Sequence, residues 1–112
     1  MTIYITHGRF TREAITGMIA KPEDRGVAVA ALAKASGAKL VDYYFTFGAY
    51  DFLVVMESNK KDTDVMASLL AAAASGGVTD LSTTVGVRSS DAVKAMKAAK
   101  KITGSFKPAG QN

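Results

Sequence analysis

Three side chains of this sequence belong to types that transfer protons in enzymes. His7 is the only histidine, and imidazole is the side chain whose charge ordinarily changes near neutral pH. Tyr44 offers a phenolic hydroxyl and Asp51 a carboxylate, both of which serve as general acids or bases in active sites. We therefore take His7, Tyr44 and Asp51 as candidate catalytic residues.

A structural role also accounts for these residues. Gly48, Tyr50 and Asp51 lie at a short connection between two strand-like runs, where glycine permits a turn and aspartate accepts backbone N–H groups. A lone histidine such as His7, without an orienting partner nearby in sequence, is typical of a surface or a subunit contact. The structural interpretation is favoured, and the catalytic one is the alternative.

The net charge of +4 is concentrated at the end of the chain. Residues 1–87 carry 8 basic and 9 acidic side chains, whereas residues 88–112 carry 6 basic and 1 acidic. A nucleic-acid-binding domain spreads positive charge over its folded surface, so this distribution disfavours a nucleic-acid partner. Arg9 and Arg12, near the predicted start of a helix, are candidate anion-binding residues, although a solvated surface with Glu13 is the favoured interpretation.

The last predicted helix, over residues 89–103, is amphipathic. Its apolar stripe is formed by Ala92, Ala95, Met96, Ala99 and Ile102. Its opposite side carries Lys94, Lys97, Lys100 and Lys101, of which Lys94, Lys97 and Lys101 are candidate contacts to an anion or a nucleic acid. The stripe lacks Trp, Phe and Leu, and the lysine side lacks Arg and aromatic residues, so packing of the stripe on a neighbouring subunit is favoured.

Composition excludes several classes of protein. The absence of cysteine rules out disulfides, Cys-zinc sites and a thiol nucleophile, and one histidine cannot form a His-rich metal site, so we expect no metal and no cofactor. No apolar run approaches the roughly 20 residues that span a bilayer, and no secretory signal is visible, so we expect a cytoplasmic protein without membrane insertion.

The elements that position the candidate residues follow from the spacing of apolar side chains. Strands are predicted over residues 2–8, 39–47, 50–57 and 78–87, and helices over 11–20, from 23 or 24 to 36, over 61–74 and over 89–103. The order β-α-β-β-α-β predicts a ferredoxin-like α+β domain with a four-stranded antiparallel sheet over residues 1–88. The helix over 89–103 and a flexible tail over 104–112 follow it.

Strand alternation predicts which side chains lie under the helices and which lie on the other face of the sheet. Assigned to the helix side are Ile3, Ile5, Val41, Tyr43, Phe45, Phe47, Phe52, Val54, Met56, Leu81, Val85 and Val87. Assigned to the other face are Tyr4, Thr6, Tyr44, Thr46, Leu53, Val55, Ser82 and Thr84. This second set is too apolar to face water and too polar for a simple core, so two copies are expected to pack sheet against sheet.

Parts of the sequence resemble the GYD family, named for a Gly-x-Tyr-Asp motif. The resemblance covers about residues 1–87 and is carried by residues 4–6, by residues 43–52 with Gly48, Tyr50 and Asp51, and by the proline-containing helix break at residues 19–25. It implies a ferredoxin-like dimeric α/β barrel. It implies no particular activity, because the family has no established one.

These observations predict a small oligomeric domain, at least a homodimer, that binds a small molecule or serves a structural role without a cofactor. The alternative is a cofactor-independent isomerase or monooxygenase with its pocket between sheet and helices. A third function is contact with an anion or nucleic acid through the lysine-rich helix. A trimeric nucleotide-sensing protein of the same fold is disfavoured, because residues 47–50 leave no room for the long loop that such proteins carry.

Overall fold

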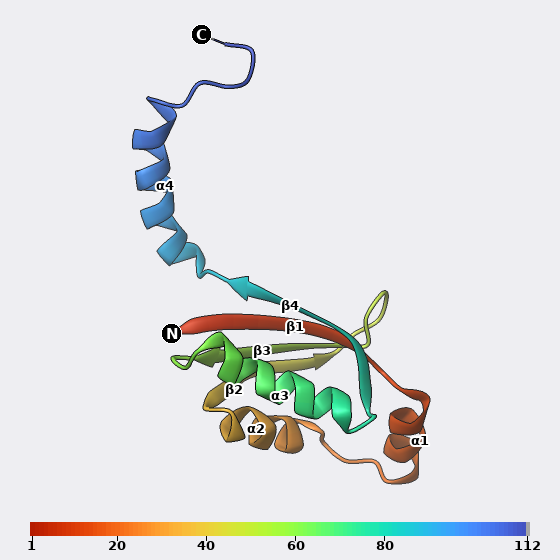
Figure 1. Cartoon of the computed structure of the whole chain (residues 1–112). Helices are drawn as coiled ribbons and strands as arrows, with labels where there is room; N and C mark the ends of the chain where they lie inside the picture. The colour runs from red at the N-terminus through yellow and green to blue at the C-terminus, as the bar shows by residue number, and fades with distance from the viewer. Residues whose placement is uncertain (112) are drawn as a thin grey trace.

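The elements follow the predicted order. The computed structural model describes residues 1–111. Its elements are β1 (Thr2–Phe10), α1 (Arg12–Ala20), α2 (Gly26–Ala35), β2 (Ala38–Phe45), β3 (Phe52–Ser58), α3 (Asp62–Ala74), β4 (Val78–Gly86) and α4 (Ser89–Thr103). The strands form a four-stranded antiparallel sheet in the order β2-β3-β1-β4, and α2 and α3 cover one of its faces (Figure 1). This is the ferredoxin-like plan, with α1 inserted before α2 and α4 added after β4.

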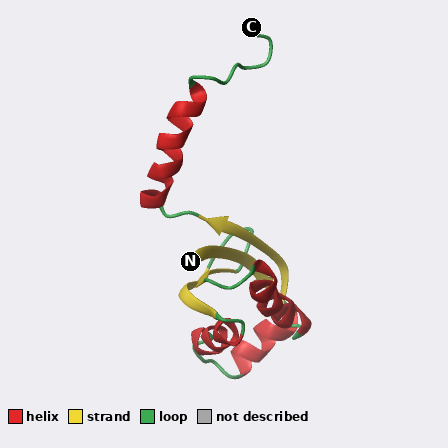
Figure 2. Ribbon diagram, turned by 60° about the vertical axis from the view of Figure 1, so that its left-hand side comes forward, coloured by secondary structure: helices red, strands yellow, loops and turns green. Residues whose placement is uncertain are grey.

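The core lies between the sheet and the two covering helices. Phe52, Val54 and Met56 alternate inward along β3, as predicted, and are buried together with Ala33 of α2 and Val65 of α3. Figure 2 shows these helices on one side of the sheet, while no described helix covers the other side. We call that uncovered side the open face. It contains the paired residues Ile3, Ile5, His7, Asp42, Tyr44, Leu53, Val55, Glu57, Ser82 and Thr84.

The prediction for β1 was wrong, because its two faces are exchanged. Tyr4 and Thr6 point toward the helices and are buried, whereas Ile3 and Ile5 lie on the open face. The hydroxyls of Tyr4 and Thr6 have partners on the helix side of the sheet. The Tyr4 hydroxyl donates to the Asp62 carboxylate at the start of α3, and the Thr6 and Thr83 hydroxyl oxygens lie 2.8 Å apart. A buried hydroxyl that is hydrogen-bonded costs little, so hydrophobicity alone assigns the wrong face.

Gly8 explains why β1 takes this register. It follows Tyr4 and Thr6 on the helix side, where a Cβ would collide with the Phe52 ring and come within 2.8 Å of Leu81 Cδ2. The close approach of the Phe52 ring requires glycine at this position.

Two valines also lie on the face opposite to the one predicted. The pairing of β2 with β3 shifts between Leu40 and Asp42, so that Leu40 packs against the core and Val41 lies on the open face. Val87 follows the end of β4 and lines the same open-face groove as Ile3. Sequence alternation cannot locate such a shift, because it assumes an uninterrupted strand.

The first two helices differ in how well the sequence located them. Thr11 caps α1 by accepting a hydrogen bond from the Ala14 amide at 3.2 Å. The apolar stripe of α1 is not buried, and Ile19 is 74% exposed. The second helix begins at Gly26 rather than at residue 23 or 24, because the Asp24 carboxylate accepts the Gly26 amide just before the first turn.

Helix α4 extends away from the sheet and helices, and the whole chain measures 65 × 30 × 22 Å (Figure 1). The residue before its first turn is Arg88, and neither Ser89 nor Ser90 caps it. Apart from Ala92, its residues are exposed. The predicted tail ends at Asn112, which lies outside the described residues. Within residues 1–111 no helix has the length and apolar character needed to cross a membrane.

Candidate functional site

The three candidate catalytic residues do not share a pocket. His7 and Tyr44 both pair with Leu53, which lies between them, so His7, Leu53 and Tyr44 form one row across the open face. Two strand spacings separate His7 from Tyr44, which is about 10 Å. Asp51 lies just before β3, where its Oδ2 accepts the Phe10 amide at 2.9 Å. None of the three lines the cavity between sheet and helices that is described below.

The Gly-x-Tyr-Asp motif holds the β2–β3 connection against the end of β1. Gly48 has φ 112°, a left-handed conformation that favours glycine, although the space around it is open. The Tyr50 ring packs 5.2 Å from the His7 ring and 5.9 Å from the Arg9 guanidinium carbon. The Asp51 amide donates to the Gly8 carbonyl oxygen at 2.8 Å. Together with the bond from Phe10, these contacts show a structural use for each residue of the motif.

The candidate anion-binding residues are dispersed. Arg9 lies 4.0 Å from the Asp80 carboxylate, and both side chains are largely exposed. Arg12 is on α1 and the lysines are on α4, at opposite ends of the molecule (Figure 1). Lys94, Lys97 and Lys101 are exposed and make no ion pair within residues 1–111. In the same residues, no cluster of His, Asp and Glu could hold a metal ion.

A cavity of about 80 Å³ lies between the sheet and the two covering helices. Its walls are almost entirely apolar and are formed by Val29, Leu32, Ala33, Tyr43, Phe52, Val54, Met56, Leu69, Ala72, Val78 and Leu81, together with Thr6 and Ser68. The Thr6 hydroxyl pairs with Thr83 and the Ser68 hydroxyl donates to the Val65 carbonyl oxygen at 2.7 Å. Because these two hydroxyls are already paired and most of the wall is apolar, the cavity suits an apolar group better than water.

A groove of about 300 Å³ lies next to this cavity. The cavity and the groove share five lining residues, Val29, Leu32, Tyr43, Ala72 and Val78, so they are neighbours with part of their walls in common. The groove also contacts Met18 of α1, Ser75 after α3 and Arg25 before α2. We call the part of the groove next to Arg25, at the start of α2, its mouth.

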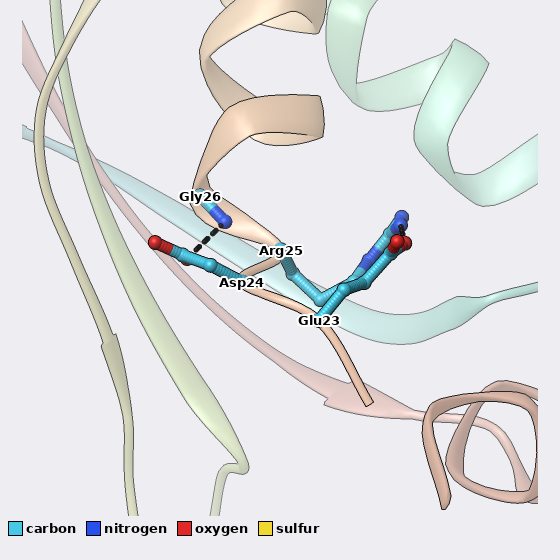
Figure 3. Close-up of polar contacts among 4 residues, drawn as sticks. All are labelled: Glu23, Asp24, Arg25 and Gly26. Atoms are coloured by element: carbon cyan, nitrogen blue, oxygen red, sulfur yellow. Dashed lines mark hydrogen bonds and ion pairs between the residues drawn. The ribbon is translucent and has the colours of Figure 1, made fainter. Parts of the chain in front are cut away.

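Tyr43 and Arg25 supply the polar groups at this mouth. Burial raises the pKa of Tyr43, the positive charge of Arg25 acts to lower it, and the Asp24 carboxylate acts to raise it. Arg25 Nη1 donates to Glu23 Oε1 at 3.0 Å, while Asp24 Oδ1 accepts the Gly26 amide at 2.8 Å. In Figure 3 the Asp24 carboxylate and the Arg25 guanidinium point to opposite sides of the loop.

Sequence reasoning assigned no function to Arg25 and placed Tyr43 in the core. The available signal was the number of alanines on α2 and α3, the two helices that lie side by side on one face of the sheet. Ala33 and Ala72 line the cavity, and Ala28 and Ala71 line the groove. Methyl side chains at facing positions leave space that larger residues would fill.

The family model for the GYD domain matches residues 4–96. The chain belongs to the GYD domain family. In this GYD domain the match continues beyond β4 into the first half of α4, whereas the motif that gives the family its name lies at residues 48–51. The activity of the family is unknown, so membership by itself assigns no reaction.

Two solved structures are similar to this GYD domain. The structure titled "crystal structure of FFRP-DM1" is 15% identical, covers 78% of this chain and 100% of its own, and has a TM-score of 0.47. Protein TTHA0845 from Thermus thermophilus is 21% identical, covers 80% of this chain and 96% of its own, and has a TM-score of 0.45. No curated protein sequence matches the GYD domain significantly.

Proposed function

We propose that this GYD domain binds a small, largely apolar molecule, without a cofactor, in the cavity and groove between the sheet and helices α2 and α3. The observation that carries the proposal is that a mostly apolar cavity and a larger groove lie side by side and share five lining residues. Small-molecule sites are typically concave, mostly apolar and of about 300 Å³ or more, with a few polar groups that orient the ligand. The groove has this size, and the polar side chains among its mostly apolar lining are those of Arg25, Tyr43 and Ser75.

The test is to fill the passage between cavity and groove. Ala72 lines both, so Ala72→Leu places a larger side chain at their junction. The fluorescent probe N-phenyl-1-naphthylamine is expected to bind wild type saturably and the variant about tenfold more weakly or worse, because the added atoms occupy the volume it needs. Titration by fluorescence, with thermal unfolding to confirm that each variant folds, measures this.

The matched control is Ala74→Leu, which makes the same change at an exposed position two residues further along α3. It is expected to bind the probe as wild type does. Equal binding by all three proteins would show that the probe lies elsewhere, and the absence of saturable binding to wild type would contradict the proposal.

The open face supports the further proposal of a homodimer, with higher oligomers built from it. Its central positions are Ile5, Leu53 and Val55, next to Ile3 and Val41, and no described helix covers them. Contiguous apolar surface of this kind marks an interface, because water would otherwise contact it. A second copy packed through the same face would bury the row that contains His7 and Tyr44.

A further inference from the structure

We propose that the ligand of this site is an apolar carboxylate, whose hydrocarbon or aromatic body lies in the cavity and whose carboxylate binds Arg25 at the mouth of the groove. This inference rests on the proposed binding function and adds the chemical class of the ligand. It is argued from the placement of Arg25, the weakness of its present ion pair and the Tyr43 hydroxyl beside it.

Arg25 is the only charged residue that lines the groove or the cavity in the described chain. It is the residue that precedes the first turn of α2, and its side chain is half-exposed. An otherwise apolar pocket with one cation at its opening binds a molecule of the matching pattern, apolar at one end and anionic at the other. The cation is in addition an arginine, whose planar fork of N–H groups fits both oxygens of a carboxylate.

Most of the N–H donors of Arg25 are not used by its existing partner, Glu23. A guanidinium has five N–H donors, and the structure records one hydrogen bond from them, Nη1 to Glu23 at 3.0 Å. The two side chains of this pair are 41% and 48% exposed, and an exposed ion pair contributes little to stability. A ligand carboxylate can therefore share or replace Glu23. Asp24 does not compete in the same way, since its carboxylate points away from the guanidinium and accepts the Gly26 amide (Figure 3).

Tyr43 supplies a second donor for the same carboxylate. Its side chain lines both the cavity and the groove, and no hydrogen bond from its hydroxyl is recorded within residues 1–111. Arg25 lines the same groove, so both residues border one space. Together they present a cation and an O–H donor at the point where the apolar walls end.

The test compares two probes by calorimetric titration at pH 7.5: 2-naphthoate, which is an anion, and its methyl ester, which has the same naphthyl body but a neutral, methylated carboxyl group. Wild type is expected to bind the carboxylate about five- to tenfold more tightly than the ester, as a charge-assisted hydrogen bond predicts. Arg25→Gln is expected to remove this preference and leave ester binding unchanged. Tyr43→Phe is expected to reduce the preference by about threefold.

Two further variants sharpen the result. Glu23→Gln removes the competing carboxylate and is expected to tighten naphthoate binding about twofold, the opposite direction from Arg25→Gln. Arg12→Gln, at an exposed position on α1 outside the groove, is expected to change neither affinity. Retained ester binding by Arg25→Gln shows that the variant folds.

The outcomes separate the two proposals. If the ester binds saturably and Ala72→Leu abolishes this binding, the binding function is supported. If wild type then shows no preference for naphthoate, or if the preference survives Arg25→Gln, the carboxylate inference is overturned. Failure of both probes to bind wild type overturns the binding function, and the inference with it.

Discussion

Asp51 contributes to the fold through both its backbone and its carboxylate. Its amide donates to the Gly8 carbonyl oxygen, its carbonyl oxygen accepts the Thr46 amide, and its Oδ2 accepts the Phe10 amide, with each bond between 2.8 and 2.9 Å. One residue therefore joins the β2–β3 connection to the last residues of strand β1. This explains the aspartate of the motif without a substrate.

Replacement of Asp51 with alanine is expected to lower the free energy of unfolding by about 1–2 kcal/mol, because the half-buried Phe10 amide loses an ionised acceptor. Urea denaturation measures the change. The control is Asp42→Ala, since Asp42 is exposed and its carboxylate accepts one long bond of 3.3 Å from the Tyr44 hydroxyl. The control is expected to stay within about 0.5 kcal/mol of wild type. Equal losses in the two variants would contradict the structural role of the motif.

Helix α4 has an apolar stripe without a packing partner among residues 1–111. Met96 is 64% and Ile102 62% exposed, and Lys94 and Lys97 lie on the other side of the helix. A helix stabilised only by its own hydrogen bonds is marginal at this length, so a packing partner for the stripe is expected. The neighbouring subunit is the partner that the sequence pattern favours.

Deletion of residues 90–112 tests whether the apolar stripe of α4 packs on a neighbouring subunit. At low protein concentration the shortened and full-length chains are expected to unfold at the same urea concentration, because α4 buries little in its own chain. At high concentration the full-length chain is expected to be the more stable, since assembly would then cover the stripe. If the two chains remain equally stable at both concentrations and form the same oligomer, α4 is an appendage that the assembly does not use.

The molecule as a whole has one covered and one open sheet face. Burial of the open face against a second copy would remove Ile3, Ile5, Leu53 and Val55 from water, at about 25 cal/mol for each Å² of apolar surface. The same association would leave the cavity on the other side of the sheet accessible. Dimerisation and ligand binding are therefore expected to be independent properties of this fold.

Ile5→Lys is expected to convert the dimer into a monomer, because its charge would be buried at the centre of the interface beside Val55. Light scattering on a size-exclusion column measures the mass. Ala30→Lys, an equal charge at an exposed position of α2, serves as the control and is expected to remain dimeric. A wild-type protein that elutes as a monomer at working concentration would refute the sheet-to-sheet dimer.

The kind and order of the elements could be predicted from the sequence alone. Apolar spacing near 3.6 or 2 residues is a local property, and it was sufficient to predict a ferredoxin-like domain followed by an amphipathic helix. The Gly48, Tyr50 and Asp51 motif was likewise placed at the β2–β3 connection, where a structural role was favoured.

Only the tertiary structure decided which faces are buried and where the pocket opens. Tyr4 is buried because Asp62 accepts its hydroxyl hydrogen, and Gly8 is required because the Phe52 ring packs against it, so partners far along the chain set the register of β1. The meeting of Arg25 and Tyr43 at one mouth depends in the same way on how α2 lies over the sheet. Local patterns record the preferences of single segments, whereas a face or a site is defined by contacts between segments.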